Sequence, residues 1–147
     1  MTLVARDADD RAEQLVLLTK RLTDLIERET SLFRARRPLE AAPFRDEKAK
    51  LANLYRQETA RITREPALVA DARAETRASL NEATTRLHVV LEEHRQALEA
   101  LQEISEGLVK SIAGYIAEIR ARDAAYGPAG ARRTTDTASA ITLDRTA

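Results

Sequence analysis

Two histidines, His88 and His94, are the side chains in this sequence best suited to metal binding or proton transfer, because the chain has no cysteine. A di-metal site in a helical bundle requires a glutamate three residues before each histidine. Those positions hold Thr85 and Leu91, so the metal-ligating motif is missing. A phosphorelay histidine would need an exposed setting of small residues, whereas three apolar residues follow His88. We therefore expect no metal and no phosphoacceptor role for either histidine.

Other catalytic and binding signatures are also missing from the sequence. It contains no glycine-rich phosphate loop, no zinc-binding spacing and no serine nucleophile motif. The formal net charge is +0, which gives no reason to expect a nucleic-acid partner. The acidic start and the lack of a long apolar run argue against a secretory signal and a membrane span. We expect a cytoplasmic protein with no enzymatic activity, no cofactor, no nucleic-acid partner and no membrane insertion.

The longest regular pattern lies in residues 67–125, which contain no proline. Their apolar residues recur at alternating steps of three and four, the spacing of a helix that packs against other helices. The predicted seam consists of Leu80, Leu87, Leu91, Leu98, Leu101, Leu108, Ile112, Tyr115 and Ile119, with Thr84, His94 and Ser105 in the remaining seam positions. The pattern predicts one very long helix with coiled-coil-like packing.

Two shorter helices are predicted before it, over about 8–36 and 44–64. The first starts at one of the aspartates Asp7, Asp9 or Asp10, which suit a helix N-terminus. Prolines separate the helices, because proline removes a backbone donor and disfavours helical geometry in the residue before it. The seam of the first helix is Leu15, Leu18, Leu22, Leu25, Glu29 and Leu32. The predicted stripe of the second is Lys48, Leu51, Tyr55, Glu58 and Ile62.

Glu29 is the one charged residue in the first seam. We expect its carboxylate to reach solvent at a thin edge of the bundle. The alternative is a buried ion pair with an arginine or lysine of a facing helix.

These elements predict an all-α fold, an elongated antiparallel bundle of three helices within residues 1–126. Glycine followed by proline at 127–128 ends the third helix. Beyond it the chain is small, polar and without periodicity, so residues 127–147 are predicted to be a disordered tail. Its two aliphatic residues, Ile141 and Leu143, are expected to be part of this loose end rather than a docking motif.

The unequal helix lengths suggest where a partner binds. If the first two helices fold back on each other, they cover only the first half of the third, and its second half exposes an apolar stripe. That stripe consists of Leu101, Leu108, Ile112, Tyr115, Ile116 and Ile119. It would bind an amphipathic helix of a partner, or of a second copy in a homodimer. The alternative places the first two helices end to end, which buries the stripe internally.

The order of motifs resembles that of the FlgN-like flagellar export chaperones. The resembling segments are LIERETSL at 25–32, DEKAKL at 46–51, Asn81 near the start of the last helix, and YGPAG at 126–130. The resemblance covers about residues 12–130. The chain departs from the family pattern in its two prolines, where the family has a glycine-aspartate turn, and in its extended tail.

The resemblance implies a cytoplasmic chaperone that binds hook-associated proteins of the hook–filament junction and delivers them to the type III export gate. It places client binding on the second half of the last helix, at the stripe defined above, and export-gate docking at Tyr126. Two alternatives remain. One is a structural coiled-coil protein that self-associates, and the other is a different soluble flagellar helical component, FliT-like or FliJ-like.

Overall fold

The computed structural model describes residues 2–127, and within them the chain forms helices joined by short turns. The elements are α1 (Ala8–Arg34), the 3₁₀ helix η1 (Pro38–Phe44), α2 (Arg45–Arg64), α3 (Ala67–Ala70) and α4 (Ala74–Ala125). The all-α fold class is confirmed. The described residues contain four α-helices rather than the predicted three.

Two compact units divide the chain, Met1–Leu108 and Val109–Ala147. The first unit holds α1, η1, α2, α3 and the larger part of α4, and the second holds the remainder of α4. Apart from Gly127, the predicted disordered tail at 127–147 lies outside the described residues, as do Ile141 and Leu143. None of the helices described has an apolar stretch long enough to cross a membrane.

Helix α1 begins and ends with recognisable capping geometry. The Asp7 carboxylate accepts a hydrogen bond from the backbone N–H of Asp10 at 2.8 Å, so Asp7 is the N-cap among the three candidate aspartates. The helix ends at Arg34, two residues before the predicted end at 36, because Arg36 is left-handed with φ 59°. The Arg37 N–H then donates to the Leu32 carbonyl at 2.8 Å, a closure typical of helix C-termini.

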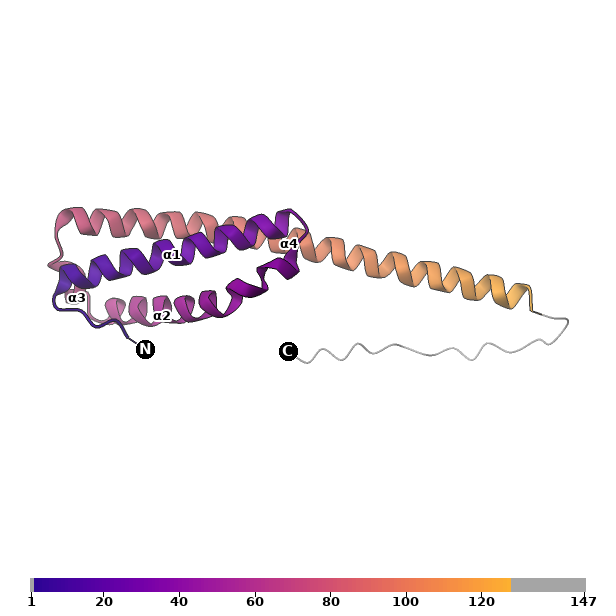
Figure 1. Cartoon of the computed structure of the whole chain (residues 1–147), viewed down its shortest axis with the longest axis horizontal. Helices are drawn as coiled ribbons and strands as arrows, with labels where there is room; N and C mark the ends of the chain where they lie inside the picture. The colour runs from indigo at the N-terminus through magenta and orange to yellow at the C-terminus, as the bar shows by residue number, and fades with distance from the viewer. Residues whose placement is uncertain (1, 128–147) are drawn as a thin grey trace. The chain divides into compact units, whose positions relative to one another are not determined.

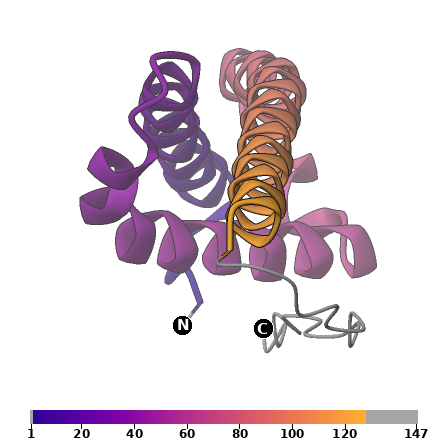
Figure 2. The same ribbon diagram turned by 90° about the vertical axis from the view of Figure 1, so that its right-hand side faces the viewer.

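Helices α1 and α2 fold back on each other, as the first of the two predicted geometries requires. Lys48 at the start of α2 pairs with Glu29 near the end of α1, and Glu58 in the second half of α2 pairs with Arg11 in the first turn of α1. Figure 1 shows α1, α2 and the first part of α4 side by side, and Figure 2 shows α2 running obliquely to the other two.

The core of the first unit lies where these three helices meet. Its members are Leu22 and Ile26 of α1 and Leu87 and Val90 of α4, against which Leu51, Ala52 and Tyr55 of α2 pack. The predicted α1 seam is confirmed, since its residues from Leu15 to Glu29 are buried and Leu32 is half-buried. The predicted α2 stripe is confirmed as well, with Glu58 fully buried and its other members half-buried.

The predicted single helix over 67–125 is wrong at residues 71–73, which separate α3 from α4. Contacts with α1 hold this break. Ala72 is buried, and the Arg73 backbone N–H and guanidinium donate to the Asp9 carboxylate at 3.0 and 2.6 Å. A second guanidinium nitrogen of Arg73 donates to Glu13 at 2.6 Å. Because these partners lie about 60 residues earlier in the chain, local sequence signals do not reveal the break.

The predicted seam of the long helix is also partly wrong. Leu87 is buried as predicted, but the seam positions at Leu91 and Leu98 are not. The buried α4 residues are Thr76, Ala83, Leu87, Val90 and Ala97. Leu91 and Leu98, predicted in the seam, are 43% and 46% exposed. The helix turns smaller side chains toward α1, because two helices approach more closely over alanine and valine than over leucine.

Buried charges in the first unit are paired. Glu58 is fully buried and accepts hydrogen bonds from Arg11 Nη1 and from the Leu3 backbone N–H, each at 2.8 Å. Glu29 is 6% exposed and bonds to Lys48, so the alternative interpretation of Glu29 holds and the expected solvent-reaching carboxylate is wrong. Among the described residues, every buried side-chain nitrogen or oxygen has a hydrogen-bond partner.

Candidate binding surface

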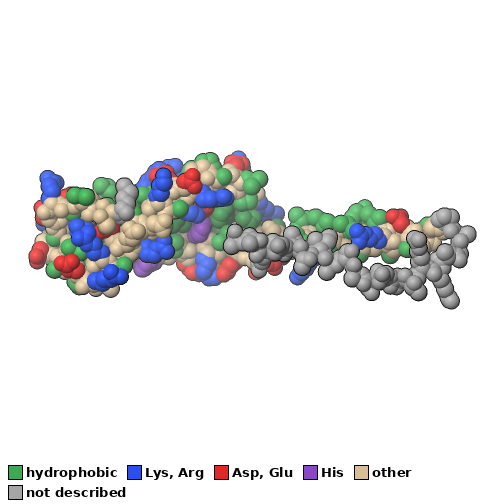
Figure 3. Space-filling view, turned by 90° about the horizontal axis from the view of Figure 1, so that it is seen from below, with side chains coloured by type: hydrophobic (Ala, Val, Ile, Leu, Met, Phe, Trp, Pro, Cys, Tyr) green, Lys and Arg blue, Asp and Glu red, His purple; other side chains and the backbone are tan. Residues whose placement is uncertain are grey.

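Residues 109–125 of the second unit form a helix whose side chains are all exposed. The predicted client-binding residues Ile112, Tyr115, Ile116 and Ile119 belong to it and are 50%, 65%, 44% and 40% exposed. With 3.6 residues per turn, these four positions lie on one side of the helix. Figure 3 shows hydrophobic side chains gathered along this segment. We call Val109, Ile112, Tyr115, Ile116 and Ile119 the 109–119 stripe.

The other two predicted client-binding residues belong to the first unit. Leu108 is 60% exposed, whereas Leu101 is half-buried. The structure therefore leaves Leu108 open to a partner and gives Leu101 only a partly accessible surface.

Two exposed apolar residues on the same helix were missed in the sequence. Ile104 and Val109 are 45% and 59% exposed. Ile104 precedes Leu108 by four residues and Val109 precedes Ile112 by three, which is the spacing that identified the rest of the stripe. The predicted seam followed Leu91 and Leu98, and the next position at the same seven-residue spacing is Ser105. The buried residues Val90 and Ala97 lead instead to Ile104.

Tyr126 lies directly after the last turn of α4 and is 89% exposed. Its backbone N–H donates to the Arg122 carbonyl at 3.0 Å, which continues the helical hydrogen-bond pattern by one residue. The phenol ring is therefore held at the helix end while its surface stays open to solvent.

Charged residues of the second unit add little order to the segment. Arg122 Nη2 and Glu118 Oε1 form an exposed (i, i+4) ion pair at 2.9 Å. Such pairs stabilise a helix by about 0.3–0.5 kcal/mol. The segment is thus an amphipathic helix whose apolar side lacks the packing that stabilises most helices in proteins.

His94, the histidine predicted to fill a seam position, is held in a polar cluster between α1 and α4. Its Nδ1 lies 3.0 Å from Thr30 Oγ1 and its Nε2 lies 3.5 Å from Glu29 Oε2. Phe33 packs against the ring with centroids 5.4 Å apart. Burial lowers the pKa of His94, the Glu29 carboxylate opposes that shift, and the Lys48 ammonium adds to it. Both ring nitrogens of His94 contact polar side chains inside the bundle, so its surroundings are those of a residue that packs within the fold. His88 is exposed.

Among residues 2–127, no group of three His, Cys, Asp or Glu side chains is arranged so that it could hold a metal ion. An exposed apolar helix face such as the 109–119 stripe is of the kind found in protein-interaction surfaces.

Comparison with known proteins places the chain among flagellar proteins. It is 44% identical over 149 aligned positions to the flagellar basal-body protein FlbY of Caulobacter vibrioides (strain ATCC 19089 / CIP 103742 / CB 15), and the alignment covers 100% of both chains. The chain belongs to the FlbY family.

The alignment with FlbY includes both the packed first unit and the exposed helix, because it covers the full length of the chain. No protein-family model matches the chain. No solved structure matches it either. The resemblance to FlgN-like chaperones stays a prediction that depends on the motifs quoted above.

Proposed function

We propose that this protein is a cytoplasmic flagellar export chaperone that binds hook-associated proteins of the hook–filament junction and delivers them to the type III export gate. The observation that carries the proposal is the 109–119 stripe, in which large apolar side chains are 40% to 65% exposed along one helix. A relative named as a flagellar basal-body protein, aligned over its full length, supports a role in the flagellum.

The physical properties of the stripe suit a temporary partner. Its residues are mostly aliphatic, and burial of apolar surface contributes about 25 cal/mol per Å² before the costs of ordering both partners. An aliphatic face of a few turns therefore supports an interaction that can be released at the export gate. The amphipathic helix of a client would pack against it by its own apolar residues at helical spacing.

The proposal assigns separate roles to two parts of the second unit. The 109–119 stripe binds the client. Tyr126, beyond the last turn, docks to the export gate. No enzymatic step is needed for either role.

The test is binding of purified hook-associated proteins, each at full length and with its terminal helix deleted, to the full-length protein. We expect Ile112→Asp to abolish binding, because it puts a charge in the middle of the stripe. Ala121→Asp is the matched control, since Ala121 lies on the opposite side of the same helix and is exposed. Binding by the Ile112→Asp variant, or equal loss in both variants, would contradict the assigned surface.

Export-gate docking needs a second measurement. We expect Tyr126→Ala to retain client affinity and to reduce secretion of the client. If client affinity falls together with secretion, the two roles are not separable.

A self-associating coiled-coil protein is the second candidate, and the same stripe favours it, because a second copy could cover it. Light scattering distinguishes the two. A dimer that Ile112→Asp converts to a monomer, without binding to any hook-associated protein, would support self-association instead.

A further inference from the structure

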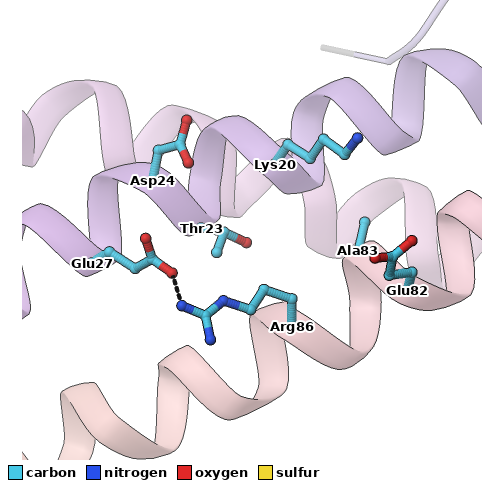
Figure 4. Close-up of a pocket in the computed structure, with 7 residues that line it drawn as sticks. All are labelled: Lys20, Thr23, Asp24, Glu27, Glu82, Ala83 and Arg86. Atoms are coloured by element: carbon cyan, nitrogen blue, oxygen red, sulfur yellow. Dashed lines mark hydrogen bonds and ion pairs between the residues drawn. The ribbon is translucent and has the colours of Figure 1, made fainter.

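Helices α1 and α4 enclose a groove in the first unit that is lined by these two helices alone. It contains two hollows, of about 370 and about 460 Å³. Glu13, Val16, Leu17, Glu75, Thr76 and Ser79 line the first hollow. Lys20, Thr23, Asp24, Glu27, Glu82, Ala83 and Arg86 line the second, which Figure 4 shows in close-up. Residues of α2 line neither of them.

The two hollows repeat each other at a spacing of seven residues. Each residue of the first hollow has a counterpart seven positions later in the second, on α1 (Glu13 and Lys20, Val16 and Thr23, Leu17 and Asp24) and on α4 (Glu75 and Glu82, Thr76 and Ala83, Ser79 and Arg86). Both helices run in the same direction, since ion pairs join Asp9 to Arg73 and Glu27 to Arg86. Seven residues are two helical turns, or about 10.5 Å.

Small side chains create the hollows. Val16, Thr23, Thr76 and Ala83 are buried and form their floor. Figure 4 shows Thr23 and Ala83 facing each other across the second hollow, with the bond between Glu27 and Arg86 joining the two helices beside it. A third helix laid in the groove would place one side chain in each hollow, seven residues apart, as knobs enter holes in helical bundles.

The edges of the groove carry an exposed leucine and an excess of acidic residues. Leu17, in the first hollow, is 68% exposed. Among the lining residues, Glu13, Asp24, Glu27, Glu75 and Glu82 are acidic, whereas only Lys20 and Arg86 are basic. Arg86 is already bonded to Glu27, and Glu13 to Arg73 outside the lining. Apart from these pairs, the lining acids Asp24, Glu75 and Glu82 outnumber the single cation Lys20. The surface therefore favours a partner with an apolar stripe flanked by cations, since complementary charge guides and orients association.

We propose that the α1–α4 groove binds an amphipathic α-helix of a partner protein, with apolar residues seven positions apart and lysine or arginine beside them. This occupant buries Leu17, fills both hollows and meets the acidic edges. The site shares no residue with the 109–119 stripe, and the proposal assigns it a binding role separate from client binding at the stripe.

The test uses two synthetic helical peptides of three heptads with leucine at every seventh position. Lysine flanks the leucines in one peptide and glutamate in the other. Titrated into the full-length protein and followed by fluorescence anisotropy, the lysine peptide is expected to bind and the glutamate peptide is not. No binding by the lysine peptide, or equal binding by both, would overturn the proposal.

Groove variants locate the binding. Glu75→Lys with Glu82→Lys reverses two exposed acids seven residues apart, and we expect it to weaken lysine-peptide binding by roughly tenfold or more. Glu99→Lys with Glu106→Lys makes the same change, at the same spacing, on exposed α4 residues outside the groove, and should have little effect. Equal affinities in the two double variants would refute the assignment of the peptide to the groove.

The apolar contribution is tested with exposed leucines. Leu17→Ala is expected to weaken lysine-peptide binding, whereas Leu39→Ala, at a leucine that is 89% exposed outside the groove, is not. Light scattering of the protein without peptide tests whether a second copy of the chain, rather than a partner helix, occupies the groove. A dimer that becomes a monomer in the Glu75→Lys, Glu82→Lys variant would show that a second copy fills the groove, and would overturn the partner-helix proposal.

Discussion

Residues 74–97 and residues 109–125 are both helical parts of α4, yet buried side chains occur only in the first stretch. The buried residues there are Thr76, Ala83, Leu87, Val90 and Ala97. The exposed apolar residues of the second stretch are larger on average: Val109, Ile112, Tyr115, Ile116 and Ile119. Apolar character alone therefore does not determine burial in this helix. The packing partners available to each stretch determine it, and the exposed apolar face of the second stretch is the surface on which the proposed function depends.

Polar interactions differ between the regions as much as apolar ones. The first unit contains the fully buried Glu58, which bonds to Arg11 and to the backbone of Leu3. The second unit contains the exposed pair of Glu118 and Arg122. Desolvation makes the first arrangement sensitive to the loss of one partner, whereas water replaces a lost partner in the second.

The largest expected effect follows from breaking the buried pair. Glu58→Leu leaves the Arg11 guanidinium buried without its carboxylate and should destabilise the first unit by about 3–5 kcal/mol. Glu118→Leu, the matched change in the second unit, should cost no more than about 0.5 kcal/mol. Urea denaturation followed by circular dichroism measures both.

Adding Arg11→Met to Glu58→Leu is the control for this interpretation, because it removes the unpaired charge and should recover much of the stability. Equal stabilities for the Glu58→Leu and Glu118→Leu variants would contradict the contrast between the two regions.

Side-chain truncation gives the second contrast. Leu87 is 1% exposed in the core of the first unit, so Leu87→Ala should lower the free energy of unfolding by about 2–5 kcal/mol. Ile112→Ala removes a similar side chain from the exposed stripe and should change it by less than about 0.5 kcal/mol. Thermal unfolding is a suitable measurement. A large loss of stability in Ile112→Ala would mean that the stripe is covered within the folded protein.

These contrasts also explain what the sequence could predict. The leucine seam of α1 and the stripe of α2 were recognisable because their burial repeats at helical spacing. The break at residues 71–73 was not, because hydrogen bonds from Arg73 to Asp9 and Glu13 hold it, and these residues are distant in the chain. The buried face of α4 was predicted wrongly because leucine is a stronger sign of a buried position than alanine. Leu91 and Leu98 were therefore chosen over Ala83 and Ala97, although small residues suit a close contact between helices.

The candidate site was only partly accessible to sequence reasoning. Apolar spacing identified Ile112, Tyr115, Ile116 and Ile119 as one face, and the structure leaves that face exposed. The ion pair that buries Glu29 could not be chosen in advance, because several cations on a facing helix could have supplied the partner. The α1–α4 groove was missed, since its floor consists of small residues that give no strong signal in either helix alone.

A smaller effect should distinguish the two regions as pH falls. The pKa of His94 is lowered in the folded protein by burial, so below about pH 6.5 the unfolded chain takes up a proton at His94 before the folded protein does. Stability from this residue is therefore full above that pH and is lost as pH falls toward the lowered pKa. The urea midpoint should decrease between about pH 7.5 and about pH 5.5, and less so in His94→Gln.

His88→Gln is the control for this measurement, because His88 is exposed on the same helix. The variant should keep the pH dependence of the unmodified protein. An unchanged pH dependence in His94→Gln would show that the cluster of Glu29, Lys48 and His94 does not contribute to it.

The smallest expected effect concerns the helix of the second unit itself. A methyl group added at Gly114 would meet no atom within 4 Å, and glycine inside a helix costs about 0.5–1 kcal/mol relative to alanine. Gly114→Ala should therefore slow amide hydrogen exchange in residues 109–125 by roughly two- to fivefold. Ala117→Gly, the reverse change on the same segment, should accelerate it. Both positions lie away from the 109–119 stripe, so client binding should be preserved in both variants. If exchange in 109–125 is already as slow as in α1 and does not respond to either change, tertiary contacts hold this helix, and the contrast between the two regions is wrong.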